Sequence, residues 1–163
     1  MKTIDGLMLK EMFLSGAANI NANRESVDAL NVFPVPDGDT GTNMCQTMNS
    51  AVKDLRDRTF PSVYEVANCA AKGALRGARG NSGVILSQIL RGFAKGLEGA
   101  EEMDAYLFAK ALRSGAEMAY KAIMKPKEGT ILTVARVTAD DIAREAQKTG
   151  DLVELFGALI NYG

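Results

Sequence analysis

The chain has 163 residues, of which 47% are hydrophobic and 24% charged, and its 19 basic and 20 acidic side chains leave a net charge of −1. This composition predicts one domain with a substantial core, and the near-neutral charge argues against a nucleic-acid-binding surface. The sequence contains no histidine, which excludes a Ser-His-Asp triad, a His general base and a His-ligated zinc site.

Apolar side chains recur at helical spacing along almost the whole chain. In chain order, the pattern predicts helices near residues 7–20, 24–30, 44–55, 61–74, 84–93, 107–123, 131–146 and 152–160. Asp5 and Asp104 are candidate N-caps, Asp151 with Glu154 fits a capping box, and Pro61 suits a first helical turn. Alternating strand patterns and internal repeats are absent, so we expect an all-α fold of seven or eight helices.

The two cysteines, Cys45 and Cys69, show no CxxC spacing and predict unpaired thiols in a reducing compartment. The N-terminal residues lack the apolar run of a signal peptide. No stretch reaches the roughly 20 apolar residues that a membrane helix needs. We therefore expect a cytoplasmic protein without a membrane span.

Two carboxylates, Asp37 and Asp39, lie one residue apart in a loop rich in proline and glycine. Such close carboxylates repel one another unless a cation lies between them. Oxygen ligands suit Mg²⁺, and Asn31 offers a further neutral oxygen. The alternative is a plain helix start with acidic residues near its positive end. An EF-hand is excluded, because its fifth and twelfth positions lack acidic ligands here.

A second candidate segment, residues 77–83, reads Gly-Ala-Arg-Gly-Asn-Ser-Gly and precedes a strongly apolar helix. Glycines let backbone N–H groups approach an anion, and a helix start favours negative charge. The alternative is a glycine-rich turn that only caps the helix. Taken with the acidic loop, the segment predicts a nucleoside triphosphate site in which Mg²⁺ bridges carboxylates and phosphates. A third loop, residues 125–132, is read on its own as a helix breaker followed by a cap.

Residues 31–44, Asn-Val-Phe-Pro-Val-Pro-Asp-Gly-Asp-Thr-Gly-Thr-Asn-Met, and residues 77–88, Gly-Ala-Arg-Gly-Asn-Ser-Gly-Val-Ile-Leu-Ser-Gln, strongly resemble the N-terminal kinase domain of bacterial fatty acid kinase. That domain belongs to the wider family of the ATP-binding subunit of dihydroxyacetone kinase. The resemblance covers nearly all of residues 1–163. It implies an antiparallel α-helical barrel that holds ATP and two Mg²⁺ ions at one mouth.

The resemblance also implies roles for individual residues. Asp37 and Asp39 match the catalytic, metal-binding aspartates, and Asn31 stands where the family has an earlier metal-binding aspartate. The positions implied to bind ATP are Thr40, Thr42, Asn43, Gly80, Asn81, Ser82, Gly83, Gly129, Thr130 and Leu132.

Two branches of this family differ at one position. Dihydroxyacetone kinases carry a histidine where this chain has Thr40, and the Phe-Pro-Val-Pro lead-in is similar to the fatty acid kinase branch. The resemblance thus implies transfer of the ATP γ-phosphoryl group to the carboxylate of a fatty acid, presented by a separate lipid-binding protein, giving an acyl phosphate. A dihydroxyacetone-kinase-type subunit, a non-catalytic nucleotide- or metal-binding module and a plain helical interaction domain stay open as alternatives.

Relatives in this family continue past residue 163 with a further glycine-rich loop and further domains. We therefore expect a kinase domain that is incomplete at its C-terminal end, with nucleotide binding weakened in the isolated piece. The expected partners are the lipid-binding protein and the remaining domains of the polypeptide, and a homodimer is left open.

Overall fold

The computed structural model describes residues 1–163 and contains eight helices. They are α1 (Gly6–Ala22), α2 (Arg24–Leu30), α3 (Thr40–Arg56), α4 (Val63–Gly77), α5 (Gly80–Gly96), α6 (Ala105–Ala122), α7 (Ile131–Glu145) and α8 (Leu152–Tyr162). The predicted all-α fold is confirmed. None of the helices is long and apolar enough to cross a membrane.

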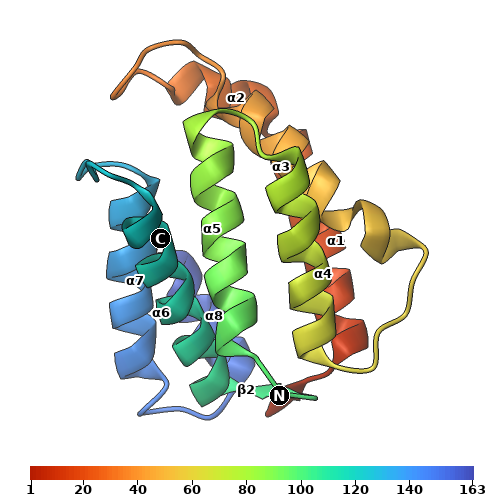
Figure 1. Cartoon of the computed structure of the whole chain (residues 1–163). Coiled ribbons are helices and arrows are strands. Elements are labelled where there is room, and N and C mark those ends of the chain that lie inside the picture. The colour runs from red at the N-terminus through yellow and green to blue at the C-terminus, as the bar shows by residue number, and fades with distance from the viewer.

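The long helices run up and down, so that neighbours along the chain are antiparallel (Figure 1). Helix α1 contacts α3 and α4, α3 contacts α4 and α5, and α5 to α8 follow one another in contact. As a result, the α2–α3, α4–α5 and α6–α7 connections lie at one end of the bundle, at the top of Figure 1. This end is called the upper end below.

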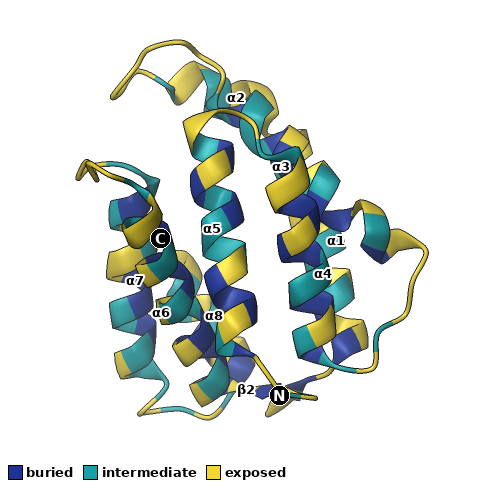
Figure 2. Ribbon diagram, viewed as in Figure 1, coloured by how far each residue is buried: buried dark blue, intermediate teal, exposed yellow.

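One core joins all seven long helices, and the buried faces point inward (Figure 2). Its largest fully buried side chains include Ile4, Leu55, Leu97, Met103, Ile142, Leu152 and Leu155. Alanines dominate the buried face of α4, which lets this helix pack closely against α3 and α5. Cys45 and Cys69 are unpaired, as predicted, and Cys45 is buried.

A short antiparallel pair of strands, β1 (Thr3–Ile4) and β2 (Met103–Asp104), departs from the prediction of no strands. Ile4 lies opposite Met103, and both side chains are fully buried. Two residues are too few for an alternating pattern to stand out in the sequence. The pair joins the start of α1 to the start of α6 at the lower end of the bundle.

Three predicted N-caps are confirmed. Asp5 accepts a hydrogen bond from the Met8 N–H, and Asp104 accepts one from the Leu107 N–H, each at 2.8 Å. Asp151 likewise caps α8. In a capping box, Glu154 would accept a hydrogen bond from the Asp151 N–H, but here both groups bond to Thr149 instead. The Glu154 carboxylate accepts from the Thr149 hydroxyl at 2.7 Å, and the Asp151 N–H donates to that same hydroxyl at 3.1 Å.

The start of α4 corrects one prediction. Pro61 was expected in the first turn, but the helix begins at Val63. The physical reason is Ser62, whose hydroxyl accepts a hydrogen bond from the Glu65 N–H at 3.1 Å and therefore serves as the N-cap. Pro61 lies outside the helix, immediately before this cap.

Candidate functional site

The acidic loop between α2 and α3 is closed by the Asn31 side chain. Its carbonyl oxygen accepts hydrogen bonds from the Asp39 N–H at 3.1 Å, the Thr40 N–H at 3.1 Å and the Thr40 hydroxyl at 2.7 Å. Its NH₂ group donates to the Val35 carbonyl at 2.9 Å. The structure thus gives the Asn31 oxygen three internal partners and makes Asn31 the residue that holds the loop in shape.

Asp37 and Asp39 are exposed on this loop. Neither carboxylate forms a hydrogen bond or an ion pair within the chain, although Asp39 occupies the N-cap position of α3. The structure holds no cluster of three His, Cys, Asp or Glu side chains. Mg²⁺ commonly takes only one or two protein carboxylates and completes its shell with water and phosphate oxygens. Two free carboxylates therefore fit a Mg²⁺ ion that is shared with a phosphate ligand.

The sequence analysis missed Asp28, a residue of α2 that caps the neighbouring helix α3. Its carboxylate accepts hydrogen bonds from the Thr42 N–H at 2.9 Å and the Thr42 hydroxyl at 2.7 Å. These bonds hold the pKa of Asp28 below its usual value. The contact joins residues on two different helices, so no local motif in the sequence indicates it.

Two backbone N–H groups in the first turn of α3 are therefore already hydrogen-bonded to side chains of the protein. The Thr40 N–H donates to Asn31, and the Thr42 N–H donates to Asp28. Thr40 and Thr42 were expected to bind ATP, and here both brace the loop. Gly41 permits the close approach, because a Cβ at this position would overlap the Arg24 carbonyl oxygen.

The start of α5 is different, since no side chain caps it. The predicted glycine-rich turn is here the first turn of the helix: α5 begins at Gly80, and only Ala78 and Arg79 separate it from α4. Residues 77–83 are therefore corrected from a turn to the end of one helix and the start of the next. The Ser82 hydroxyl is buried and has no hydrogen-bond partner. Uncapped N–H groups beside an unpartnered hydroxyl fit an anionic ligand such as phosphate.

The two candidate segments are in direct contact. A Cβ at Gly80 would overlap the Asn43 amide, and a Cβ at Gly83 would overlap the Thr47 hydroxyl. The Arg79 N–H donates to that same hydroxyl at 3.2 Å. The start of α5 therefore lies directly against the first turns of α3, and a Cβ at Gly80 or Gly83 would force the Asn43 or Thr47 side chain to move. Of the expected ATP-binding residues, Asn43 and Gly80 are brought together.

The third segment reaches the acidic loop from α7. A Cβ at Gly129 would lie 3.9 Å from the Phe33 ring. Thr130 caps α7, with its hydroxyl accepting from the Leu132 N–H at 3.3 Å. The Leu132 side chain is 2% exposed and packs with Ile85 of α5 in a small core. It therefore contributes to packing between α7 and α5.

Large apolar side chains are exposed around the same end of the bundle, which the sequence analysis did not single out. Those more than half exposed at the end of α2 and in the α2–α3 and α6–α7 connections are Leu30, Val32, Phe33, Val35 and Met124. Their exposure ranges from 54% to 97%. Clustered exposed apolar side chains are typical of interaction surfaces.

Comparison with known proteins places the sequence of this chain in a family. The DAK2 domain family matches residues 34–162, which include Asp37, Asp39 and the start of α5. Protein YloV of Bacillus subtilis is 50% identical over 159 residues, covering 98% of this chain and 29% of YloV. An uncharacterized protein of Staphylococcus saprophyticus is 50% identical over 157 residues, covering 96% of this chain and 28% of that protein. An uncharacterized protein of Staphylococcus aureus is 47% identical over 157 residues, covering 96% and 29%.

The chain spans less than a third of the length of these relatives. The family match nevertheless covers most of the chain and contains both aspartates and the uncapped start of α5. The chain therefore belongs to the DAK2 domain family, which is dihydroxyacetone-kinase-like and associated with kinase activity.

Proposed function

We propose that this chain is the ATP- and Mg²⁺-dependent kinase domain of a fatty acid kinase, which phosphorylates a fatty acid presented by a separate lipid-binding protein. One observation carries the proposal. A pair of free carboxylates and an uncapped helix start lie in contacting segments at one end of the bundle. Membership of a kinase-like family supports the same class of reaction.

Each part of the site has a task in this proposal. Asp37 and Asp39 hold Mg²⁺, which supplies charge neutralisation for the triphosphate. Asn31 keeps the loop in the shape that presents both carboxylates. The first-turn N–H groups of α5 and the Ser82 hydroxyl bind phosphate oxygens. The glycines at 80 and 83 keep this helix start close to α3.

The chemistry of the acceptor agrees with the residues present. A fatty acid carboxylate is already an anion, so its oxygen attacks the γ-phosphorus and ADP leaves without any proton being removed. The chain has no histidine to serve as a base. Thr40 stands where the dihydroxyacetone kinase branch has a histidine. Its hydroxyl donates a hydrogen bond to the Asn31 side-chain oxygen at 2.7 Å and thereby helps to hold the loop. A carboxylate acceptor therefore suits this site better than an alcohol.

The exposed apolar side chains at the upper end support a protein partner that carries the acyl group. Leu30, Phe33 and Met124 are 77%, 59% and 97% exposed. Burying them against a partner would be favourable by about 25 cal/mol per Å². The relatives are more than three times as long as the matched region, so we propose that their further domains complete the partner-binding surface.

Nucleotide binding is tested first by thermal unfolding with MgATP, with ATP plus EDTA, and without ligand. At about 100 times its dissociation constant, a ligand stabilises the folded state by about 2.7 kcal/mol. We expect a rise in Tm with MgATP that Asp37→Asn abolishes. Asp57→Asn is the matched control, because Asp57 is an exposed aspartate at the opposite end of α3 and should leave the rise intact. The same rise in both variants would overturn the metal assignment.

Phosphoryl transfer is tested in the full-length polypeptide with the lipid-binding protein loaded with fatty acid. We expect an acyl phosphate that hydroxylamine traps, and its loss in both Asp37→Ala and Asp39→Ala. Binding of MgATP without transfer would instead identify a non-catalytic module. Transfer to free dihydroxyacetone would assign the chain to the other branch of the family.

A further inference from the structure

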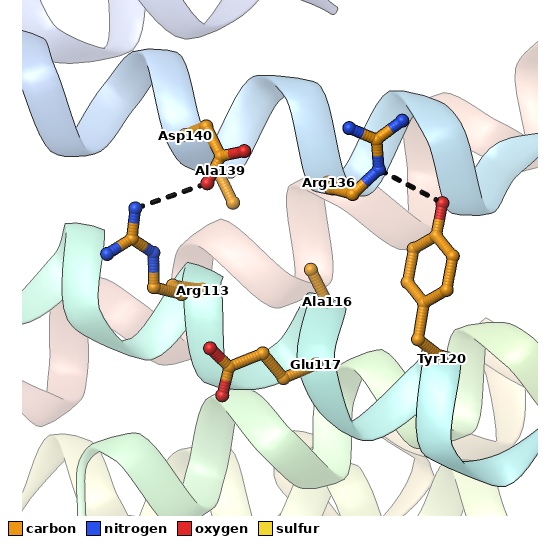
Figure 3. Close-up of a pocket in the computed structure, with 7 residues that line it drawn as sticks. All are labelled: Arg113, Ala116, Glu117, Tyr120, Arg136, Ala139 and Asp140. Carbon is orange, nitrogen blue, oxygen red and sulfur yellow. Dashed lines mark hydrogen bonds and ion pairs between the residues drawn. The ribbon is translucent and has the colours of Figure 1, made fainter.

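Two cavities of similar volume open on the sides of the bundle, and they differ in how their charged side chains are paired. One, of about 270 Å³, lies between α6 and α7 and is drawn in Figure 3. Both of its arginines are engaged. Arg113 pairs with Asp140 at 3.1 Å, and Arg136 pairs with Glu128 at 3.0 Å and also donates to the Tyr120 hydroxyl. This cavity therefore offers no free cation to a ligand.

The second cavity, of about 240 Å³, lies between the end of α3, the α3–α4 connection and the outer face of α4. Three cations line it, Arg58, Lys72 and Arg76, together with two carboxylates. Both carboxylates have partners, since Asp54 pairs with Arg76 and Glu65 accepts a hydrogen bond from the hydroxyl of the α4 N-cap serine at 3.1 Å. The Arg58 and Lys72 side chains form no hydrogen bond or ion pair within the chain. The cavity therefore presents two positive charges without an internal counterion.

The connection that forms one wall of this second cavity, residues 57–62, is held in place by α1. The Lys10 ammonium group donates to the Arg58 carbonyl at 2.7 Å. A Cβ at Gly6 would lie 2.7 Å from the Phe60 carbonyl oxygen, so the start of α1 lies directly against this segment. The Phe60 side chain lines the cavity, is half-buried and packs against the core. The wall is thus fixed before any ligand binds, which reduces the entropy lost on binding.

The Cys69 thiol also lines the second cavity and shows how its charges are arranged. Burial raises the pKa of Cys69 and Asp54 raises it further, whereas the three cations lower it. All four charged groups therefore lie close enough to act on the same sulfur atom. The cations consequently surround one part of the cavity instead of being scattered over the surface.

We propose that the second cavity binds a phosphate monoester group, with Arg58 and Lys72 neutralising the phosphate and Phe60 contacting the organic group that carries it. A guanidinium matches phosphate oxygens with two parallel N–H donors, and an ammonium group adds a compact charge. At neutral pH a phosphate monoester carries a charge of about −1.5 to −2, which two free cations complement. The proposal does not rest on the proposed nucleotide site. Asp54 lies near the other end of α3 from Thr40, about 20 Å away at about 1.5 Å per residue.

The test uses phenyl phosphate, without ATP or Mg²⁺, and follows the amide chemical shifts of the protein by NMR. We expect saturable shifts at residues 58–60 and 65–76. Binding should be about tenfold weaker in Arg58→Gln and in Lys72→Gln, because each substitution removes a charge-assisted hydrogen bond. Lys53→Gln is the matched control, since Lys53 is an exposed lysine of α3 that does not line the cavity, and it should bind like the wild type.

A second readout is the rate at which iodoacetamide alkylates Cys69, with the modified peptide identified by mass spectrometry. Cys45 is only 3% exposed and should react far more slowly. Bound phenyl phosphate should slow the reaction of Cys69, because a nearby negative charge disfavours the reactive thiolate. Inorganic phosphate should bind more weakly than phenyl phosphate, since it cannot contact Phe60.

Two further ligands identify the source of the phosphate. Binding of glycerol 3-phosphate, without binding to phosphatidylcholine vesicles that contain phosphatidic acid, would assign a soluble ester. Binding to those vesicles that Lys72→Gln abolishes would assign a lipid headgroup, and both results support the site. Absence of shifts at residues 58–60 and 65–76 would overturn the proposal, as would equal weakening in Lys53→Gln, which indicates only general attraction. Asp37→Asn should bind phenyl phosphate like the wild type, so failure of the nucleotide site leaves this test intact.

Discussion

At the residue scale, the helix starts of α3 and α5 are the most informative contrast in the molecule. Both carry sequences that suggest anion binding, but Asp28 and Asn31 already occupy the N–H groups at the start of α3. The start of α5 has no cap and leaves the Ser82 hydroxyl unpartnered. An internal carboxylate at α3 would repel a phosphate there. In the proposed function, the two helix starts therefore have different roles: the carboxylates before α3 would hold Mg²⁺, and the start of α5 would bind phosphate.

Asp28 should contribute to stability in a pH-dependent way. Asp28→Ala removes the cap on Thr42, so we expect a lower Tm at pH 7. The folded-state pKa of Asp28 is lowered, so its stabilising effect is fully present above the unfolded-state pKa of about 3.9 and is lost as the pH falls through the folded-state value. The Tm difference between wild type and variant should therefore shrink below about pH 4. Thermal unfolding from pH 7 to pH 2.5 measures it.

A double-mutant cycle with Thr42→Val identifies the source of this effect. Both variants break the same hydroxyl–carboxylate hydrogen bond. The double variant should therefore lose less folding free energy than the sum of the losses in the two single variants. Strict additivity, or a Tm difference that persists at low pH, would contradict the assignment of Asp28 as the cap of α3.

At the element scale, the contact between α5 and α6 depends on glycine. A Cβ at Gly92 would overlap the Ser114 carbonyl oxygen, and one at Gly96 would lie 2.6 Å from the Ala111 Cα. Because the obstacles are backbone atoms, they cannot move as a flexible side chain could. We expect Gly92→Ala to lower the free energy of unfolding by about 1–3 kcal/mol, measured by urea denaturation.

Gly16 provides the matched control for this substitution. It also lies within a helix, α1, but is exposed and has no atom within 4 Å of an added Cβ. Alanine there gains helix propensity without a clash, so Gly16→Ala should raise the free energy of unfolding by about 0.5–1 kcal/mol. Destabilisation of similar size in both variants would mean that α5 and α6 are not as close as described.

The elements were predictable to the extent that their causes are local. Apolar spacing predicted all eight helices, and aspartates directly before apolar runs predicted the caps at Asp5, Asp104 and Asp151. The strand pair was missed because it depends on Ile4 meeting Met103, two residues far apart in the sequence. Asp28 was missed for the same reason. For the site, the sequence indicated the two segments. It did not indicate that the start of α3 is capped and the start of α5 is not, because that difference arises from tertiary contacts.

At the scale of the whole molecule, the two ends of the bundle are held differently. At the lower end, the strand pair joins α1 to α6, and the Leu152 N–H donates to the Met1 carbonyl at 2.8 Å. At the upper end, α2 contains no buried residue, and hydrogen bonds from Asp28 and from Asn31 just after the helix join it to the start of α3. The proposed site thus lies at the end with less core packing, where a ligand can contribute order.

Native-state hydrogen exchange should display this difference along the bundle. Local opening costs least where few apolar side chains are buried, so amides of α2 should exchange orders of magnitude faster than those of α4, whose inner face is buried throughout. Added MgATP should slow exchange at residues 31–43 and 80–83 and leave the centre of α4 nearly unchanged. Protection that rises equally in all helices would indicate only global stabilisation. Protection confined to the lower end would place the ligand away from Asp37 and α5 and contradict the proposed site.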